Sequence, residues 1–371
     1  MFGIKLPQKQ NLKRYNALFM VLTKYGFEDI MANSQARKFI PKKYLLKHPD
    51  TEKRLSGSTF QRIRMVLEEL GPSYVKMGQI MSNRDDMLPP DLVKELEKLQ
   101  DHAPTLQNFE VEKVLSQELN INCPQYFLSI DPKPLAAASL AQVHKAQLLN
   151  GDWVALKIQR PNIAEVIASD ISIMKEVAEA LEKYSAQVKA FQPAKLVESF
   201  EKSVNEELSF HREMDNMEHF ARNFMDNNDI YVPKLYRELS NDHIICMEWI
   251  DGIKVSELEK LKAKNIDSSA VAKVGVDLYL EQVLEHGFFH ADPHPGNLFV
   301  LPEVQKICFI DFGMMGTIMP KDKEALIDLL LCFLKKDVRK LIPVLKKIAI
   351  RSEIPDEKKL EYDLYELVEG I

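Results

Sequence analysis

The stretch His290-Ala291-Asp292-Pro293-His294-Pro295-Gly296-Asn297 places a carboxylate and a carboxamide five residues apart in a loop. Two short apolar runs follow it, Phe299–Val300 and Lys306–Ile310, and they predict a pair of strands on either side of a turn. The tripeptide Asp311-Phe312-Gly313 comes directly after the second run. An Asp at the end of a strand, just before a turn that contains Gly, can present its carboxylate to a metal ion.

Phosphoryl transfer needs a carboxylate near the attacking oxygen and ligands for the metal ions that neutralise the phosphates. Asp292 and Asn297 have the spacing of the protein-kinase catalytic loop, and His290 stands two residues before the Asp, as in that loop. Taken alone, Asp292 also fits an Asx turn beside two prolines. Asp311 follows Asn297 by fourteen residues, and this second carboxylate favours a metal site over a plain Asx turn. We therefore predict Asp292 as the catalytic aspartate and Asn297 and Asp311 as Mg²⁺ ligands.

A lysine on a predicted strand is the next candidate. Val154-Ala155-Leu156-Lys157 matches the kinase strand whose Lys contacts the α- and β-phosphates and pairs with a Glu. The alternative is an edge-strand lysine in solvent. Three glutamates in one predicted helix are the candidate partners: Glu206, Glu207 and Glu213. Glu207 and Glu213 lie six residues apart, so they face different sides of that helix.

A glycine-rich loop is expected before this strand, but the sequence has an alanine-rich segment there: Ala136, Ala137, Ala138 and Ser139. Glycines let backbone amides approach phosphates at φ/ψ values that other residues reach only at a cost. We expect this loop to be stiffer and to hold the nucleotide differently. The alternative is a plain turn that leads into a strand.

Composition narrows the class of protein. The 371 residues are 46% hydrophobic and 28% charged, with a net charge of −6 and a pI near 5.9, which is typical of a globular protein and gives no support for nucleic-acid binding. The four cysteines form no CxxC pair, which argues against a zinc site or a disulfide framework. We expect neither a signal peptide nor a transmembrane helix.

The order of predicted elements indicates an α+β protein. The first 120 or so residues are mainly helical, with Gly71-Pro72 breaking a pattern that spans 59–82. Strands and inserted helices follow, and then mainly helices. The predicted strands are 126–130, 140–148, 153–159, 229–232 and 243–249, and the predicted helices are 162–190, 193–225, 268–286 and the chain from 321. Asn150-Gly151 predicts a hairpin turn between the strands 140–148 and 153–159. This order is that of a bilobal kinase-like fold with an N-terminal helical extension over 1–120, an N-lobe with inserted helices over 121–250 and a C-lobe over 251–371.

Two motifs together give a family resemblance. The alanine-rich segment Ala136–Ser139 stands in place of the glycine-rich loop, and Lys76-Met77-Gly78-Gln79 forms a KxGQ motif in the helical extension. On these motifs the chain resembles the UbiB/AarF family of atypical kinases from about residue 60 to 330. Conventional kinases lack this pair of motifs.

The resemblance implies roles for particular residues. Lys76 and Gln79 would belong to an extension that folds over the active site, and Glu207 would approach Lys76. Lys157 would contact phosphate, with Glu213 as its ion-pair partner. The adenine-binding hinge would include Glu248, Trp249 and Ile250. Where the family's ExD motif ends in Asp, this chain has Ser209, which supplies no charge.

The resemblance also implies cofactors and partners. ATP or ADP and Mg²⁺ would bind, and the activity would support isoprenoid-quinone biosynthesis or lipid homeostasis. The partners would be membrane lipid, quinone precursors and quinone-biosynthesis proteins, and the resemblance also allows a homodimer. The location would be cytoplasmic and peripheral at the inner face of a membrane. Two alternatives stay open: a small-molecule phosphotransferase of the aminoglycoside or choline kinase type, and a catalytically silent nucleotide-binding scaffold.

Overall fold

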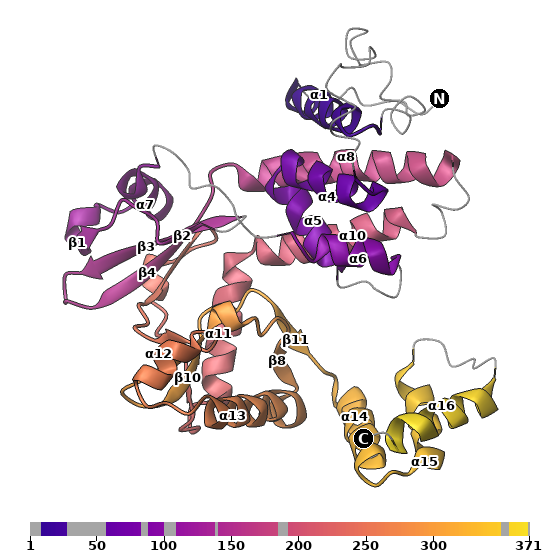
Figure 1. Cartoon of the computed structure of the whole chain (residues 1–371). Helices are drawn as coiled ribbons and strands as arrows, with labels where there is room; N and C mark the ends of the chain where they lie inside the picture. The colour runs from indigo at the N-terminus through magenta and orange to yellow at the C-terminus, as the bar shows by residue number, and fades with distance from the viewer. Residues whose placement is uncertain are drawn as a thin grey trace. The chain divides into compact units, whose positions relative to one another are not determined.

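The computed structural model describes residues 9–27, 57–82, 88–99, 109–137, 140–184, 192–349 and 356–369. Two compact units are present: one contains residues 1–211 and 236–249, and the other contains residues 212–235 and 250–371. The three-part division expected from the sequence stays a prediction. Each unit is described below by itself (Figure 1).

Helices make up the first part of the first unit. The helix predicted over 59–82 does break where expected, because Pro72 opens a new helix and Gly71 adopts a φ of 100°. The buried core between these helices includes Phe19, Val66, Tyr74 and Phe200. The helices are α1 (Lys9–Lys24), α4 (Thr59–Leu70), α5 (Pro72–Ser82), α6 (Pro90–Leu96), α8 (Ile163–Tyr184) and α10 (Pro193–Glu207).

A five-stranded antiparallel sheet forms the rest of this unit, with the order β1-β3-β4-β6 and β2 paired to β3. The Asn150-Gly151 turn joins β3 to β4 as predicted, and Gly151 takes the positive φ of 92° that this turn requires. Helix α7 (Val111–Leu119) packs its buried Leu115 into the core shared with this sheet. The strands are β1 (Phe127–Ile130), β2 (Ala136–Ala137), β3 (Ala141–Leu148), β4 (Trp153–Gln159) and β6 (Ile244–Glu248); two 3₁₀ turns cover Cys123–Gln125 and Arg237–Leu239.

The second unit has two small sheets among helices. One sheet has the order β5-β10-β9-β7, and the other pairs β11 with β8. Its strands are β5 (Ile230–Tyr231), β7 (Ile253–Lys254), β8 (Phe288–His290), β9 (Leu298–Leu301), β10 (Lys306–Phe309) and β11 (Met315–Thr317). Its helices are α11 (Phe210–Asn223), which begins in the first unit, α12 (Leu258–Ala263), α13 (Ser268–Glu281), α14 (Pro320–Leu334), α15 (Val338–Ile348) and α16 (Glu357–Glu369), with a 3₁₀ turn over Pro295–Asn297.

Two predicted helices are shorter or more divided than the sequence indicated. The prediction of one helix over 193–225 is wrong, because α10 ends at Glu207 and α11 begins at Phe210. Glu207 and Glu213 therefore lie on two helices rather than on two sides of one. The helix predicted over 268–286 is α-helical only to Glu281 and continues as a π-turn over Gln282–His286. Of the helix predicted over 162–190, residues 185–190 lie outside the described part of the chain.

No helix in the described ranges combines the length and the apolar character that a bilayer crossing requires.

Candidate active site

The loop that carries Asp292 begins at a short strand in the second unit. Strand β8 pairs antiparallel with β11, so that His290 lies opposite Met315, and the N–H of Ala291 donates to the carbonyl of Met314 at 2.9 Å. The chain then turns, and the N–H of His294 donates to the carbonyl of Asp292 at 2.7 Å. These bonds hold the Asp292 backbone while its side chain stays exposed. An exposed carboxylate on a fixed backbone is suited to meeting a substrate hydroxyl or a water.

The predicted Mg²⁺ ligands lie on either side of one β-hairpin. Strands β9 and β10 pair antiparallel, with Leu298 opposite Phe309. Asn297 comes directly before β9, and the N–H of Ile310, directly after β10, donates to the Asn297 carbonyl at 3.2 Å. The hairpin thus brings Asn297 and Asp311 to the same end of the sheet, although fourteen positions separate them in sequence.

His290 links the two loops through its ring. The ring is buried, its Nδ1 lies 3.2 Å from the backbone nitrogen of Asp292, and its Nε2 lies 2.6 Å from the carbonyl oxygen of Asp311. The backbone N–H of Asp292 can only donate and the carbonyl of Asp311 can only accept. In this arrangement Nδ1 accepts from Asp292 and Nε2 donates to Asp311, so the ring ties the Asp292 loop to the Asp311 loop.

Helix α11 contributes two side chains beside Asp311. Glu213 is buried, and its Oε2 lies 3.8 Å from where a Cβ on Gly313 would stand. Asn216 Nδ2 donates to the carbonyl of Phe312 at 2.9 Å. Sequence reasoning missed Asn216, although it follows Glu213 by three positions and so shares its face of the helix.

The chemistry of these side chains fits a hard divalent cation. Asn amide and Asp carboxylate oxygens are ligands that Mg²⁺ accepts, and Mg²⁺ usually keeps several waters and takes further oxygens from substrate phosphates. The N–H of Gly313 donates to Asp311 Oδ1 at 2.9 Å, which holds the carboxylate in place. Across the described ranges, no three or more His, Cys, Asp or Glu side chains gather as a metal site.

Lys157 lies in the first unit, in the middle of the sheet. On β4 it faces Val143 of β3 and Ile245 of β6, so it is not an edge-strand residue as the alternative required. Its Nζ lies 5.4 Å from the centre of the Phe210 ring. Its half-buried position on a central strand is suited to a fixed cation.

The alanine-rich segment starts as strand β2. Ala136 pairs with Val143 and Ala137 with Gln142, so these two residues run antiparallel to β3. Ala138 and Ser139 lie outside the described residues. The pairing shows that these two alanines are held by a strand ladder.

The predicted hinge residues come at the end of β6. Glu248 pairs with Val154, and the N–H of Trp249 donates to the carbonyl of Trp153 at 2.9 Å. Lys145 Nζ lies 4.5 Å from the ring centre of Trp249. Ile250 is the first residue of the chain's return to the second unit.

The KxGQ motif lies on α5, and its residues contact two different neighbours, Glu207 and Leu99. Lys76 Nζ lies 2.9 Å from Glu207 Oε2 on α10. Gln79 Nε2 donates to the carbonyl of Leu99 at 3.4 Å, and Gly78 is packed so closely that a Cβ there would lie 2.2 Å from Leu99 Cδ1. Lys76 and Gly78 point to different sides of α5, as residues two apart in a helix do.

The predicted site residues are divided between the two units. Lys157, the alanine segment, Glu248, Trp249 and the Lys76–Glu207 pair are in the first, and the catalytic and metal residues and Glu213 are in the second. The ion pair between Lys157 and Glu213 and the covering of the site by the extension therefore stay predictions.

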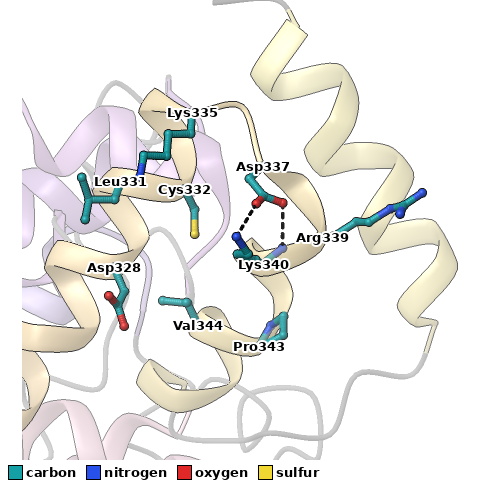
Figure 2. A pocket seen from close by; sticks show the side chains of 9 residues that line it. All are labelled: Asp328, Leu331, Cys332, Lys335, Asp337, Arg339, Lys340, Pro343 and Val344. Carbon is teal, nitrogen blue, oxygen red and sulfur yellow. Dashed lines mark hydrogen bonds and ion pairs between the residues drawn. The ribbon is translucent and has the colours of Figure 1, made fainter.

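A separate pocket of about 380 Å³ lies between α14 and α15, as Figure 2 shows. Its wall contains Leu331, Cys332 and Val344, and Lys340 at its rim forms an ion pair with Asp337 at 3.1 Å. None of the residues predicted for the active site lines it.

Known proteins share both the sequence and the fold. The model of the ABC1 atypical kinase-like domain matches residues 98–345. The chain is 36% identical to "Probable protein kinase UbiB" of Aliivibrio fischeri over 89% of this chain and 61% of that protein. It is 37% identical to the uncharacterized protein sll1770 of Synechocystis sp. over 79% of this chain and 50% of that protein. The chain thus spans about half to three-fifths of these relatives.

One solved structure is similar to this chain in fold over most of its length. The complex of Rv3197 with erythromycin from Mycobacterium tuberculosis has a TM-score of 0.56 and 27% identity, over 82% of this chain and 77% of that one. The expected α+β kinase-like fold and the resemblance to UbiB proteins are both confirmed. The chain belongs to the ABC1 atypical kinase-like family.

Proposed function

We propose that the chain is an ATP-dependent phosphotransferase or ATPase that uses Mg²⁺. The observation that carries this proposal is the hairpin β9–β10, which brings Asn297 and Asp311 together beside the Asp292 loop. Mg²⁺, when bound by these two residues, supplies the positive charge that neutralises the phosphates. Asp292 takes the proton of the attacking oxygen, and Lys157 contacts the phosphates.

Two further features of the chain support this assignment. Helix α11 places the buried Glu213 against Gly313, where it is suited to orient a lysine that approaches the phosphates. Helices α5 and α10 share one buried core, which includes Tyr74 and Phe200, and Lys76 pairs with Glu207 beside it, so the extension is a packed part of the first unit. We propose that this extension limits access to the site, so that the phosphate acceptor is a small molecule or water more readily than a protein.

The biological setting is the finer part of the proposal. Relatives named as probable UbiB kinases favour a role in isoprenoid-quinone biosynthesis or lipid homeostasis. A membrane-facing surface would suit such a role. On α14, Leu330, Leu331 and Leu334 are exposed, and Leu334 is 81% exposed. Lys335 and Lys336 follow directly, and apolar residues beside lysines are typical of helices that bind at an anionic lipid surface.

The test measures nucleotide binding and turnover separately. Calorimetric titration with ATP, with and without Mg²⁺, gives affinity, and phosphate release gives turnover, each with vesicles of anionic or zwitterionic lipid and with phenols that resemble quinone precursors. We expect Mg²⁺-dependent binding and hydrolysis that anionic vesicles increase. Mg²⁺-dependent binding without turnover under every condition would leave a nucleotide-binding scaffold, and no Mg²⁺-dependent binding would refute the proposal.

A further inference from the structure

Gln282 is the first residue of the π-turn that follows α13 and is fully buried. Its Oε1 accepts a hydrogen bond of 2.9 Å from the backbone N–H of His290, eight residues ahead in the chain. Its Nε2 is also buried and has no hydrogen-bond partner among the described residues. One end of the amide is thus engaged and the other is not.

Both features are unfavourable in a helix end that serves only as packing. A π-turn is rare and mostly occurs as a single turn, frequently at functional sites. A buried amide N–H without a partner loses its hydration and gains nothing in return. A methionine would fill a similar volume at Gln282 with no such loss. Within the Gln282 side chain, the oxygen makes a specific hydrogen bond and the described residues offer the nitrogen none, so the bond to His290 is what this side chain contributes.

The hydrogen bond between Gln282 and His290 holds the residue that connects the Asp292 loop to the Asp311 loop. Fixing the His290 backbone fixes the direction in which its ring leaves β8. The ring then accepts from the N–H of Asp292 at 3.2 Å and donates to the carbonyl of Asp311 at 2.6 Å. Directly after β11, the N–H of Ile318 donates to the carbonyl of Gly287 at 2.8 Å, which holds the other end of β8. Gln282 thus reaches the catalytic and metal loops through one histidine.

We propose that Gln282 is a positioning residue for the Mg²⁺ site: its oxygen fixes His290 so that the ring joins the Asp292 loop to the Asp311 backbone. The inference rests on the proposed Mg-nucleotide function and names a residue that the kinase motifs do not include. It acts on metal binding and on the proton position of His290, and it leaves the binding of metal-free nucleotide unchanged.

The experiment compares three variants of the full chain. Gln282→Met removes the acceptor and keeps the volume. Gln282→Glu keeps an acceptor oxygen, and at pH 6 burial favours its neutral, nearly isosteric form. Leu278→Ala is the control, since Leu278 is buried one turn earlier on α13 and has no bond to the loop. Calorimetry gives ATP affinity with and without Mg²⁺, and nitrogen NMR of ¹⁵N-histidine-labelled protein gives the proton position of the His290 ring.

We expect Gln282→Met to reduce the gain in ATP affinity from Mg²⁺ roughly tenfold, a change of about 1.4 kcal/mol, and to alter the His290 ring signals. Gln282→Glu should restore most of the gain, and Leu278→Ala should keep it. The inference is overturned if Gln282→Met keeps the full gain, or if Leu278→Ala loses as much. If the wild type shows no Mg²⁺ effect, the proposed function fails, and unchanged His290 signals in Gln282→Met would overturn the inference separately.

Discussion

Replacement of Gly78 by alanine tests why the KxGQ motif contains glycine. Gly78 is buried in the middle of α5, and an added Cβ would lie 2.2 Å from Leu99 Cδ1 and 2.9 Å from Leu67 Cδ1. Both distances are shorter than a carbon–carbon contact allows, and Leu99 is itself only 5% exposed. The leucine side chains must therefore shift within a packed core to admit one methyl group.

Two opposing effects set the magnitude. Alanine is better than glycine inside a helix by about 1 kcal/mol. Forcing an extra methyl group into a packed core costs about 1–3 kcal/mol. Because two leucine methyl groups are affected, we expect the upper part of this range and a net loss of about 1–2 kcal/mol in the unfolding free energy of the first unit.

Gly275 supplies a matched control in the second unit. It is also in the middle of a helix, α13, but a Cβ there would meet only Ile307 Cδ1, at an ordinary 3.7 Å. Gly275→Ala should therefore stabilise its unit by about 0.5–1 kcal/mol. Because the two glycines lie in different units and amide hydrogen exchange reports stability locally, exchange in α5 and α13 is the assay. If Gly78→Ala stabilises α5 as Gly275→Ala stabilises α13, the packing argument is wrong.

Three further predictions concern charged or titrating groups. Asp311→Asn should abolish the effect of Mg²⁺ on ATP affinity and leave the circular dichroism spectrum unchanged; a retained Mg²⁺ effect would remove Asp311 from the metal site. A double-mutant cycle of Lys76→Ala and Glu207→Ala should give a coupling below about 1 kcal/mol, since both side chains are partly exposed; a much larger coupling would mean that the pair holds the fold. Burial lowers the pKa of His144, so the unfolded chain takes up this proton first as the pH falls below about 6.5. The stability that this group contributes is thus present above that pH and lost below it. His144→Gln keeps a donor for the Asp131 carbonyl, so in urea unfolding this variant should lose less unfolding free energy between pH 7.5 and 5.5 than the wild type. An equal loss in both proteins would contradict this.

Local patterns in the sequence were enough for much of the fold. The strands predicted over 140–148 and 153–159 and the Asn150-Gly151 turn together predicted the hairpin that carries Lys157, and Gly71-Pro72 predicted the break between α4 and α5. Both rest on interactions between near neighbours in the chain, which is why a single sequence reveals them.

The break between α10 and α11 was missed because neither glycine nor proline marks it. Leu208 is still helical as the C-cap of α10, and Ser209 lies directly before the first residue of α11. Serine is among the residues preferred at helix N-caps, so Ser209 was the available signal. The same residue stands where the family motif has Asp. Ser209 supplies no charge, and Lys76 has Glu207 as its partner.

The residues that bond to the loops of the proposed Mg²⁺ site could not be predicted from the sequence. Asp292, Asn297 and Asp311 were predicted because carboxylates and an amide at kinase spacing indicate their chemistry. Gln282 and Asn216 were not, because each bonds to the backbone of a distant residue: Gln282 to the N–H of His290, and Asn216 to the carbonyl of Phe312. Every residue except proline offers the same backbone groups, so such partners leave no pattern in a single sequence. The side chains proposed for the chemistry can therefore be predicted from this sequence, whereas the side chains that hold their loops in position are found only in the structure.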